Sequence, residues 1–485
     1  MRTKKLIKLV AILIIVGVLS LTNSIGLVNG VGGQSDANAS TLGLAQSNQS
    51  WSWIYEGPIY LVDLYYISED GTFKALTEKI PELKELGIKT IWLVPIFDHS
   101  NPKIYHHVVD YYKIYPPHGS EADLRELIET VHKNGMRIIF DLVTSYAPED
   151  SILWKEHKDW FIYDENGTVQ HTWPNDFGLA INRKHPEVIK YFSEVAKYYV
   201  EEYDIDGWRM DSVANNWNPK TVQGDYSCTE LLRSVKQAIT SVKPDAILLA
   251  EQPGPLYQWP SPYNPPWIKF NGSGFRLEYV ADPVFDEMCE LSQQLGAFFY
   301  YWIVKVSEGA LPTSSDLVYT LHHEKIWYGR ARVRFIEHYD TVGRFGRIQV
   351  LAPNLHKPLA TLIFTIPGVP LITAGQEVGA TGGWQETVDW EHGDYTLRCF
   401  YKKLMQIRSM NKALLHPSAN ITDVWAGGDI TLAYLRNYED NYIITVINLR
   451  GKPASSILSL PVQSMDIKMK DKYTLYDLLL SLIHI

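Results

Sequence analysis

Gly207-Trp208-Arg209-Met210-Asp211 is the stretch that decides the fold prediction for this chain of 485 residues. It follows an amphipathic run over 185–203 and a tight Asp-Ile-Asp turn at 204–206, which predicts a helix and then a short strand. Residues two apart on a strand point to the same face, so Arg209 and Asp211 should lie side by side. The guanidinium would keep the carboxylate ionised and oriented, as a nucleophile requires. Taken alone, the stretch is explained better by an ordinary surface Arg–Asp ion pair than by a catalytic carboxylate.

Outside this stretch, apolar strand-like runs alternate with helical patterns from residue 58 to 410. Such alternation is typical of repeated βαβ units. Eight strands can be assigned, which favours a closed (β/α)8 barrel over an open doubly wound sheet. The expected strands are 59–67, 90–96, 137–143, 207–211, 246–251, 276–280, 332–338 and 369–373, and a helix is expected over 285–306.

The regions that flank the barrel divide the chain further. Basic residues precede an apolar run over 9–21, so we expect residues 1–30 to be a signal peptide, with an uncleaved membrane anchor as the alternative. The Gly/Ser/Asn/Gln-rich residues 31–50 indicate a flexible linker. Within the 51–415 barrel region, residues 144–184 form an irregular excursion. Alternating strands and glycine turns predict a β domain over 420–485, whose apolar end suggests that it is incomplete.

Charge and cysteine content narrow the classes of function. The formal net charge is −10, and removing the four basic residues of the leader changes it to −14. An acidic surface argues against nucleic acid and anionic membranes as partners. The three cysteines allow at most one disulfide, and no Cys/His spacing suggests zinc.

Three carboxylates stand at three different strand ends: Asp211, Glu251 and Asp340. Cleavage of a glycosidic bond with retention needs one carboxylate as nucleophile and a second carboxyl to protonate the leaving oxygen. A third carboxylate can stabilise the positive charge of the transition state. Glu251 follows the apolar run 247–250, which would raise its pKa and favour the acid form. The alternative is that all three form buried ion pairs with Arg209, Arg332 or Arg334.

The motifs together resemble the α-amylase family of glycoside hydrolases, glycoside hydrolase family 13, as a divergent member over residues 55 to 450. Each motif alone is weak, but their order and spacing are specific. The matching segments are Ile139-Phe-Asp141-Leu-Val-Thr-Ser-Tyr146, Gly207-Trp-Arg209-Met-Asp211, Leu248-Leu-Ala-Glu251, Arg334-Phe-Ile-Glu-His-Tyr-Asp340 and Gly368-Val-Pro-Leu-Ile372 with Gly375-Gln-Glu377.

The resemblance implies a TIM barrel with a short inserted domain B after strand 3, over 144–184, and a C-terminal antiparallel β domain. It also implies roles for the site residues: Asp211 as nucleophile, Glu251 as acid/base, Asp340 as transition-state stabiliser and Arg209 as the residue that holds Asp211.

Departures from the family pattern affect the sugar-binding residues. Two histidines that would bond sugar hydroxyls are replaced by Tyr146 and Tyr339, and a stacking tyrosine is replaced by His106. Phenols hydrogen-bond but carry no positive charge, so these residues and His338 predict a reshaped sugar subsite. Ser145 and Asn215 weaken the family's calcium site. No metal ligands are therefore assigned, and no cofactor, calcium included, is expected to be required.

These observations predict a secreted, extracellular retaining α-glycoside hydrolase whose substrate is an α-glucan or maltooligosaccharide. Its intermediate would be a covalent glycosyl-Asp211 ester. A transglycosidase shares that intermediate and stays open as an alternative. A non-catalytic carbohydrate-binding homologue is a second alternative, because fold alone does not give activity. No nucleic acid is expected as a partner, nor any membrane beyond the secretion leader.

Overall fold

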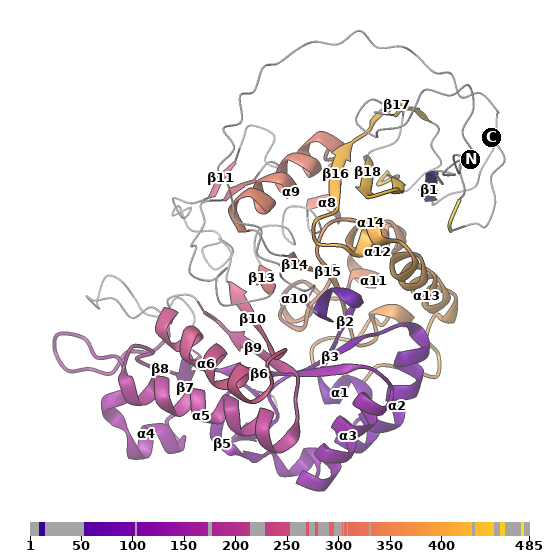
Figure 1. Cartoon of the computed structure of the whole chain (residues 1–485). Helices are drawn as coiled ribbons and strands as arrows, with labels where there is room; N and C mark the ends of the chain where they lie inside the picture. Colours follow the sequence, from indigo (N-terminus) through magenta and orange to yellow (C-terminus); the bar gives the residue numbers. More distant parts are fainter. Residues whose placement is uncertain are drawn as a thin grey trace, which may run out of the picture.

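A closed barrel of parallel strands forms the centre of the protein (Figure 1). The computed structural model describes residues 9–14, 53–101, 104–172, 177–213, 228–252, 268–270, 277–279, 291–294, 303, 305–307, 309–328, 331–428, 432–450, 456–460 and 477–479. The barrel strands are β2 (Ile59–Val62), β3 (Thr90–Leu93), β6 (Arg137–Val143), β9 (Gly207–Asp211), β10 (Ile247–Gln252), β13 (Leu291–Gln294), β14 (Ala331–Arg334) and β15 (Val369–Thr373). The predicted (β/α)8 barrel is confirmed.

Helices follow the barrel strands and pack one apolar face against them. In α3 the buried residues Leu124, Leu127, Ile128 and Val131 recur at helical spacing, and a Ser120–Asp123 capping box starts the helix. The longer helices are α2 (Phe73–Leu86), α3 (Glu121–Lys133), α5 (Pro186–Tyr203), α6 (Thr229–Val242), α9 (Ser314–Tyr328), α12 (His356–Thr365) and α13 (Tyr395–Met410), and the shorter ones include α1 (Leu64–Ile67), α4 (Ile152–Glu156), α10 (Tyr339–Phe345), α11 (Ile348–Leu351) and α14 (Lys412–Leu415).

The sixth barrel strand was predicted in the wrong place. The expected strand at 276–280 is β12 (Leu277–Tyr279), which pairs antiparallel with β11 (Ile268–Phe270) outside the barrel. The sixth strand is β13, which lies inside the expected helix 285–306. Its Leu-Ser-Gln-Gln sequence has no strand pattern, and parallel pairing with β10 and β14 overrides its helical preference.

Three other expected strands are shorter than predicted. Strand β3 ends at Leu93, and the other two end early because polar residues at their ends start helices. Strand β2 ends at Val62, and the Asp63 side chain accepts a 3.0 Å hydrogen bond from the Tyr65 amide at the start of α1. Strand β14 ends at Arg334, and His338 is the N-cap of α10. Both caps lie at the carboxyl ends of barrel strands, which is the end where barrel enzymes carry their sites.

Smaller sheets surround the barrel. After β3, strands β4 (Phe97–His99) and β5 (Val108–Ile114) form an antiparallel ribbon, and the excursion 144–184 after β6 begins and ends with the paired β7 (Tyr146–Ala147) and β8 (Leu179–Ala180). The C-terminal region contains β16 (Asn420–Asp423), β18 (Leu432–Tyr438) and β19 (Asn441–Ile447) in one antiparallel sheet, with β17 (Trp425–Gly428) and β20 (Ser456–Ser459) as a second pair.

One further strand comes from the other end of the chain. Residues of the expected leader form β1 (Leu9–Ile14), which pairs in parallel with β19 along the edge of the C-terminal sheet (Figure 1). Within the part of the chain that the structure describes, no helix is both long and apolar enough to cross a membrane. The expected linker 31–50 and the last residues, 480–485, lie outside the described residues.

Candidate active site

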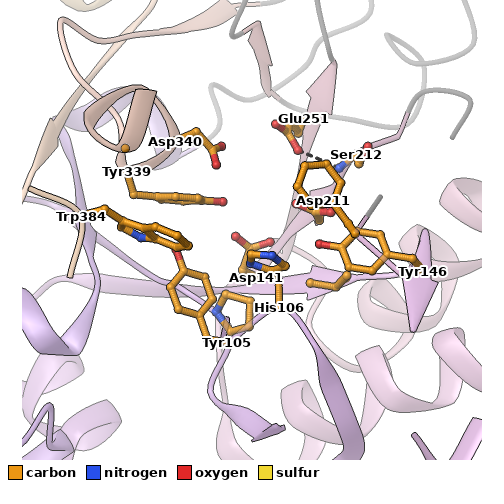
Figure 2. Close-up of a pocket in the computed structure, with 14 residues that line it drawn as sticks. Tyr105, His106, Asp141, Tyr146, Asp211, Ser212, Glu251, Tyr339, Asp340 and Trp384 are labelled. Atoms are coloured by element: carbon orange, nitrogen blue, oxygen red, sulfur yellow. Dashed lines mark hydrogen bonds between the residues drawn. The ribbon is translucent and has the colours of Figure 1, made fainter. Parts of the chain in front are cut away.

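A cavity of about 210 Å³ lies at the carboxyl ends of the barrel strands. Acidic side chains from four of these strand ends meet in its lining: Asp141, Asp211, Glu251 and Asp340. Aromatic and histidine rings complete the described wall (Figure 2), namely Tyr105, His106, Tyr146, Phe177, Tyr339 and Trp384. The structure therefore brings the three predicted catalytic carboxylates into one pocket.

Arg209 lies beneath this pocket and links its carboxylates. Its side chain is fully buried, and Nη1 donates 2.7 Å and 2.8 Å hydrogen bonds to Oδ1 of Asp211 and Oδ1 of Asp141. Its Nη2 forms a 2.7 Å ion pair with Oε2 of Glu251. The guanidinium also lies 5.2 Å from the centre of the Trp92 ring. Arg209 thus orients both expected reacting carboxylates from below and does not itself line the pocket.

Glu251 has the properties of a general acid. Burial raises the pKa of Glu251 to about 8, and the charges of Asp211 and Asp340 act in the same direction against the lowering effect of Arg209. The carboxyl is therefore protonated at neutral pH. The Ser212 amide donates a 2.8 Å hydrogen bond to Oε2, which fixes the orientation of the group.

Asp141 supports the site from deeper in the barrel. It is fully buried and accepts hydrogen bonds of 2.8 and 3.0 Å from Nη1 of Arg209. Burial raises the pKa of Asp141 to about 7, while the Arg209 charge lowers it. Asp141 therefore holds Arg209 in place at the base of the pocket, which it also helps to line.

His338, which was expected to bind the substrate, is not among the residues that line the pocket. Its ring is fully buried, with centroids 5.3 Å from Trp92 and 4.1 Å from Tyr339. Its Nδ1 accepts a 3.4 Å hydrogen bond from the Asp340 amide at the start of α10. The physical reason is that capping this helix turns the ring inward, so that His338 positions Asp340.

Tyr146, Tyr339 and His106 lie together in the pocket lining, although they come from three separate segments. The His106 ring packs edge-on against Tyr146 at a centroid distance of 6.0 Å. Burial lowers the pKa of His106 to about 4, so the ring is neutral at neutral pH. Burial also raises the pKa of Tyr339 well above its ordinary value, so its phenol presents a neutral hydroxyl group.

Seven lining residues were not singled out as site residues from the sequence: Pro95, Tyr105, Val143, Phe177, Ser212, Gly343 and Trp384. Tyr105 directly precedes His106, and Phe177 lies near the end of the excursion, so both could have been found by position. Trp384 follows the expected eighth strand by eleven residues, and no pattern indicates that its loop returns to the pocket. Of the tryptophans in the excursion, Trp160 is buried and Trp154 packs against the core, while Trp173 lies outside the described residues.

Metal binding has little structural support among the described residues. Among them, no three His, Cys, Asp or Glu side chains gather in a way that could hold an ion. Ser145 is buried at the base of the excursion, and Asn215 lies outside the described residues.

The barrel and the trio of carboxylates at its strand ends define a glycosidase-type site, in which one buried arginine contacts both Asp211 and Glu251. The family comparison agrees with this class. The model for the α-amylase catalytic domain matches residues 36–180 and 178–413. The chain therefore belongs to the α-amylase family of glycoside hydrolases.

Two relatives within the family are 28–29% identical to this chain over the matched residues. A cyclomaltodextrinase from Thermoanaerobacter pseudethanolicus is 29% identical over 429 residues, covering 83% of this chain and 67% of the relative. A maltogenic α-amylase from Bacillus acidopullulyticus is 28% identical over 423 residues, covering 82% and 66%. The chain thus spans about two thirds of the length of these relatives.

Solved structures show the same fold at lower identity. An α-amylase from Lactobacillus plantarum superposes with a TM-score of 0.66 at 20% identity, over 82% of this chain and 89% of that one. A maltogenic α-amylase from Thermotoga neapolitana gives a TM-score of 0.64 at 20% identity, over 81% and 86%. At this identity the likeness establishes the barrel architecture alone.

Proposed function

We propose that this protein is a retaining α-glycoside hydrolase that acts on α-glucans and prefers short maltooligosaccharides to long starch chains. The observation that carries the proposal is the pairing of Asp211 and Glu251 with the two Nη atoms of one buried arginine. Relatives named as a cyclomaltodextrinase and a maltogenic α-amylase support the substrate class.

The reaction follows from the two carboxyl groups. In the first step the Asp211 carboxylate attacks the anomeric carbon while Glu251 gives its proton to the departing glycosidic oxygen. The bond that forms is a glycosyl ester of Asp211, and the bond that breaks is the glycosidic C–O bond. In the second step the Glu251 carboxylate takes a proton from water, whose oxygen displaces Asp211 and releases the sugar with its original anomeric configuration. Asp340 stabilises the positive charge that develops on the sugar ring.

Electrostatics lets Glu251 serve as acid first and base second. Before reaction, the negative charge of Asp211 helps to raise the pKa of Glu251. Formation of the ester removes that charge, so the pKa of Glu251 falls and its carboxylate can accept a proton from water. Glu251 therefore changes its protonation state in step with formation and hydrolysis of the Asp211 ester.

The preference for short substrates rests on the pocket rings. A phenol is longer than an imidazole, so Tyr146 and Tyr339 narrow the pocket in which the reacting sugar would sit. Secretion is part of the proposal and rests only on the basic and apolar pattern of residues 1–30.

The test is to incubate the protein with maltooligosaccharides, cyclodextrin, starch and trehalose, and to follow the products by chromatography and the first-formed anomer by NMR. We expect α-anomers from short α-glucans. Asp211→Asn and Glu251→Gln should each lower turnover on the order of a thousandfold or more, with the fold intact by circular dichroism. Glu201→Gln, an exposed carboxylate on α5, is the matched control and should have no effect. Near-normal rates in either site variant, or β-anomers as first products, would contradict the mechanism.

A further inference from the structure

Trp92 is a fully buried residue of the barrel strand β3, and its side chain contacts Arg209. Arg209 belongs to β9, and both strands are neighbours of β6 in the barrel. Side chains from alternate strands share a layer of a barrel interior. The barrel topology therefore brings this indole and this guanidinium together, although they are far apart in the sequence.

The Trp92 ring covers the face of the Arg209 guanidinium, whose central carbon lies 5.2 Å from the ring centre. The hydrogen bonds and ion pairs of this guanidinium run through its two Nη atoms to the carboxylates, and its Nε has no hydrogen-bond partner among the described residues. A guanidinium is attracted to an aromatic face, and more strongly where water is excluded. The ring thus restricts the tilt of the plane from which Arg209 reaches the carboxylates.

The indole N–H of Trp92 is buried without a hydrogen-bond partner among the described residues. A buried indole N–H usually has a partner, and leaving it without one costs stability. A purely apolar side chain would fill the barrel interior without that cost. An indole at this position is therefore explained by its ring face, which attracts a cation more strongly than the other aromatic side chains do.

The same ring also supports the residue next to Asp340. The Trp92 ring centre lies 5.3 Å from that of His338 and 6.5 Å, edge-on, from that of Tyr339. His338 in turn accepts a 3.4 Å hydrogen bond from the Asp340 amide, and its Nδ1 lies 3.5 Å from Oδ2 of the same residue. Trp92 therefore contacts both buried side chains that hold the three carboxylates of the site, Arg209 on one side and His338 on the other.

We propose that Trp92 is a positioning residue for the reaction, although it is not among the residues that line the pocket. Its ring face sets the plane of the Arg209 guanidinium and thereby the mutual arrangement of Asp211 and Glu251. The inference rests on the proposed function, because it takes these two carboxyl groups as the reacting pair.

The pH dependence of activity separates this role from simple packing. Burial raises the pKa of Glu251, and the charges of Asp211 and Asp340 raise it further. The Arg209 charge and the Ser212 amide lower it. A guanidinium without its ring support is held less closely to Glu251, so its lowering effect weakens and the pKa rises. The alkaline limb of kcat/KM then moves to higher pH, which a loss of core packing alone would not cause.

The experiment replaces Trp92 by side chains with less ring face, and measures rates on maltotriose across neutral and alkaline pH. Trp92→Leu, which has no ring, should lower kcat about tenfold or more with little change in KM. Its alkaline limb should move to higher pH by about half a unit or more. Trp92→Phe keeps a smaller ring and should show the same changes to a lesser extent.

A difluorinated tryptophan placed at residue 92 alone keeps the shape of the side chain, and covers the case in which Trp92→Leu does not fold. Fluorine withdraws electron density from the ring and so weakens its attraction for a cation. With the fold intact by circular dichroism, this protein should show an alkaline limb moved in the same direction as in Trp92→Phe.

The matched control is Trp208→Phe. Trp208 is as fully buried as Trp92, and it precedes Arg209 on β9, but neighbours on a strand point to opposite faces. Its ring packs against Phe97 and Tyr199. This variant should leave the alkaline limb in place. A limb that stays unmoved in every folded Trp92 variant, or that Trp208→Phe moves equally, would overturn the positioning role.

A titration without turnover separates this inference from the proposed function. NMR of protein with isotope-labelled glutamate, with Glu251→Gln to assign the signal, measures the pKa of the Glu251 carboxyl directly. The positioning role predicts a higher value in Trp92→Phe than in the unaltered protein. If the unaltered protein hydrolyses no α-glucan while this difference is seen, the proposed function fails and the positioning role stands. An unchanged pKa of Glu251 overturns the positioning role even where hydrolysis is normal.

Discussion

The backbone amide of Ser212 donates a 2.8 Å hydrogen bond to Oε2 of Glu251, so the residue after the proposed nucleophile holds the proposed acid. Ser212 has a φ of 44°, a strained value for a residue with a side chain. Its carbonyl oxygen accepts a 2.8 Å hydrogen bond from Nη1 of Arg183, which is 2% exposed. Arg183 follows β8 at the end of the excursion and acts on Glu251 through this one peptide unit.

We expect Arg183→Met to shift the pH dependence of activity as well as lower kcat. Without the charged donor on its carbonyl, the Ser212 peptide becomes a weaker and less well oriented donor to Glu251. Since that hydrogen bond lowers the pKa of Glu251, its weakening should move the alkaline limb of kcat/KM to higher pH. Arg183→Lys keeps the positive charge and should bring the alkaline limb part of the way back. Lys184→Met, at the neighbouring residue, is the control and should leave the limb unchanged. A lower kcat with an unmoved alkaline limb would mean that Arg183 serves only the stability of the excursion.

The unaltered enzyme should lose activity as the pH rises through about 8, the value to which burial raises the pKa of Glu251. The sign follows from the proposed role: the first step needs the protonated carboxyl, which is present below the pKa and lost above it. The measurement is kcat/KM on a maltooligosaccharide across neutral and alkaline pH, where the limb reports the free enzyme. Full activity well above this pH would show that Glu251 is not the acid.

The double variant Tyr146→His with Tyr339→His should move the substrate profile towards starch. Both phenols line the pocket, and their replacement by shorter imidazoles widens it. The readout is the ratio of kcat/KM on starch to that on maltotriose. Tyr112→His, on an exposed residue of β5, is the control and should leave the ratio unchanged. An unaltered ratio in the double variant would remove the tyrosines as determinants of chain length.

Asp206 should be a major stabilising residue, although it lies far from the pocket at the start of β9. It is fully buried and ion-paired to Arg137 at 2.7 Å, and to His132 and Lys243 at 2.8 Å each. Burial by itself would raise its pKa, but hydrogen bonds from His132, Lys243 and the Ile138 amide lower the pKa of Asp206 to about 2. Asp206→Asn should therefore cost about 3 kcal/mol of unfolding free energy at neutral pH.

The pH dependence of that stability has a definite sign. A carboxylate with a lowered pKa stabilises the folded state above its unfolded pKa and loses this contribution as the pH falls towards the folded value. Denaturant titrations at neutral and strongly acidic pH should show a larger acid-induced loss in the unaltered protein than in Asp206→Asn. Equal losses in the two proteins would exclude Asp206 as a source of acid sensitivity.

How far the sequence predicts this fold depends on where each element finds its partners. Strands β6, β9 and β15 carry dense apolar runs, and their predicted bounds are those of the structure. Strand β13 has no such run, because its stability comes from pairing with β10 and β14, residues far away in the sequence. Local patterns could not reveal it, and the helical preference of its residues led to the wrong assignment.

The same distinction applies to the site. The three carboxylates lie at strand ends: Asp211 and Glu251 in the last residues of their strands, and Asp340 after β14. The barrel topology alone brings strand ends together, so their shared pocket was predictable. Trp384 reaches the pocket through a turn held by Arg347 and Glu386, and neither contact has a sequence signal. The buried position of His338 has no sequence signal for a related reason: whether a ring faces a pocket or caps a helix depends on the exact residue at which α10 begins.

The covalent glycosyl-Asp211 intermediate is the central claim, and trapping it is its most direct test. A fluorinated α-glucosyl fluoride, whose glycosyl–enzyme ester hydrolyses slowly, is incubated with the protein, and the digested peptides are analysed by mass spectrometry. We expect one fluoroglucosyl group on the peptide that contains Asp211, and none in the Asp211→Asn variant. Labelling of another carboxylate, or turnover of the reagent with an inverted product and no labelled peptide, would contradict the account.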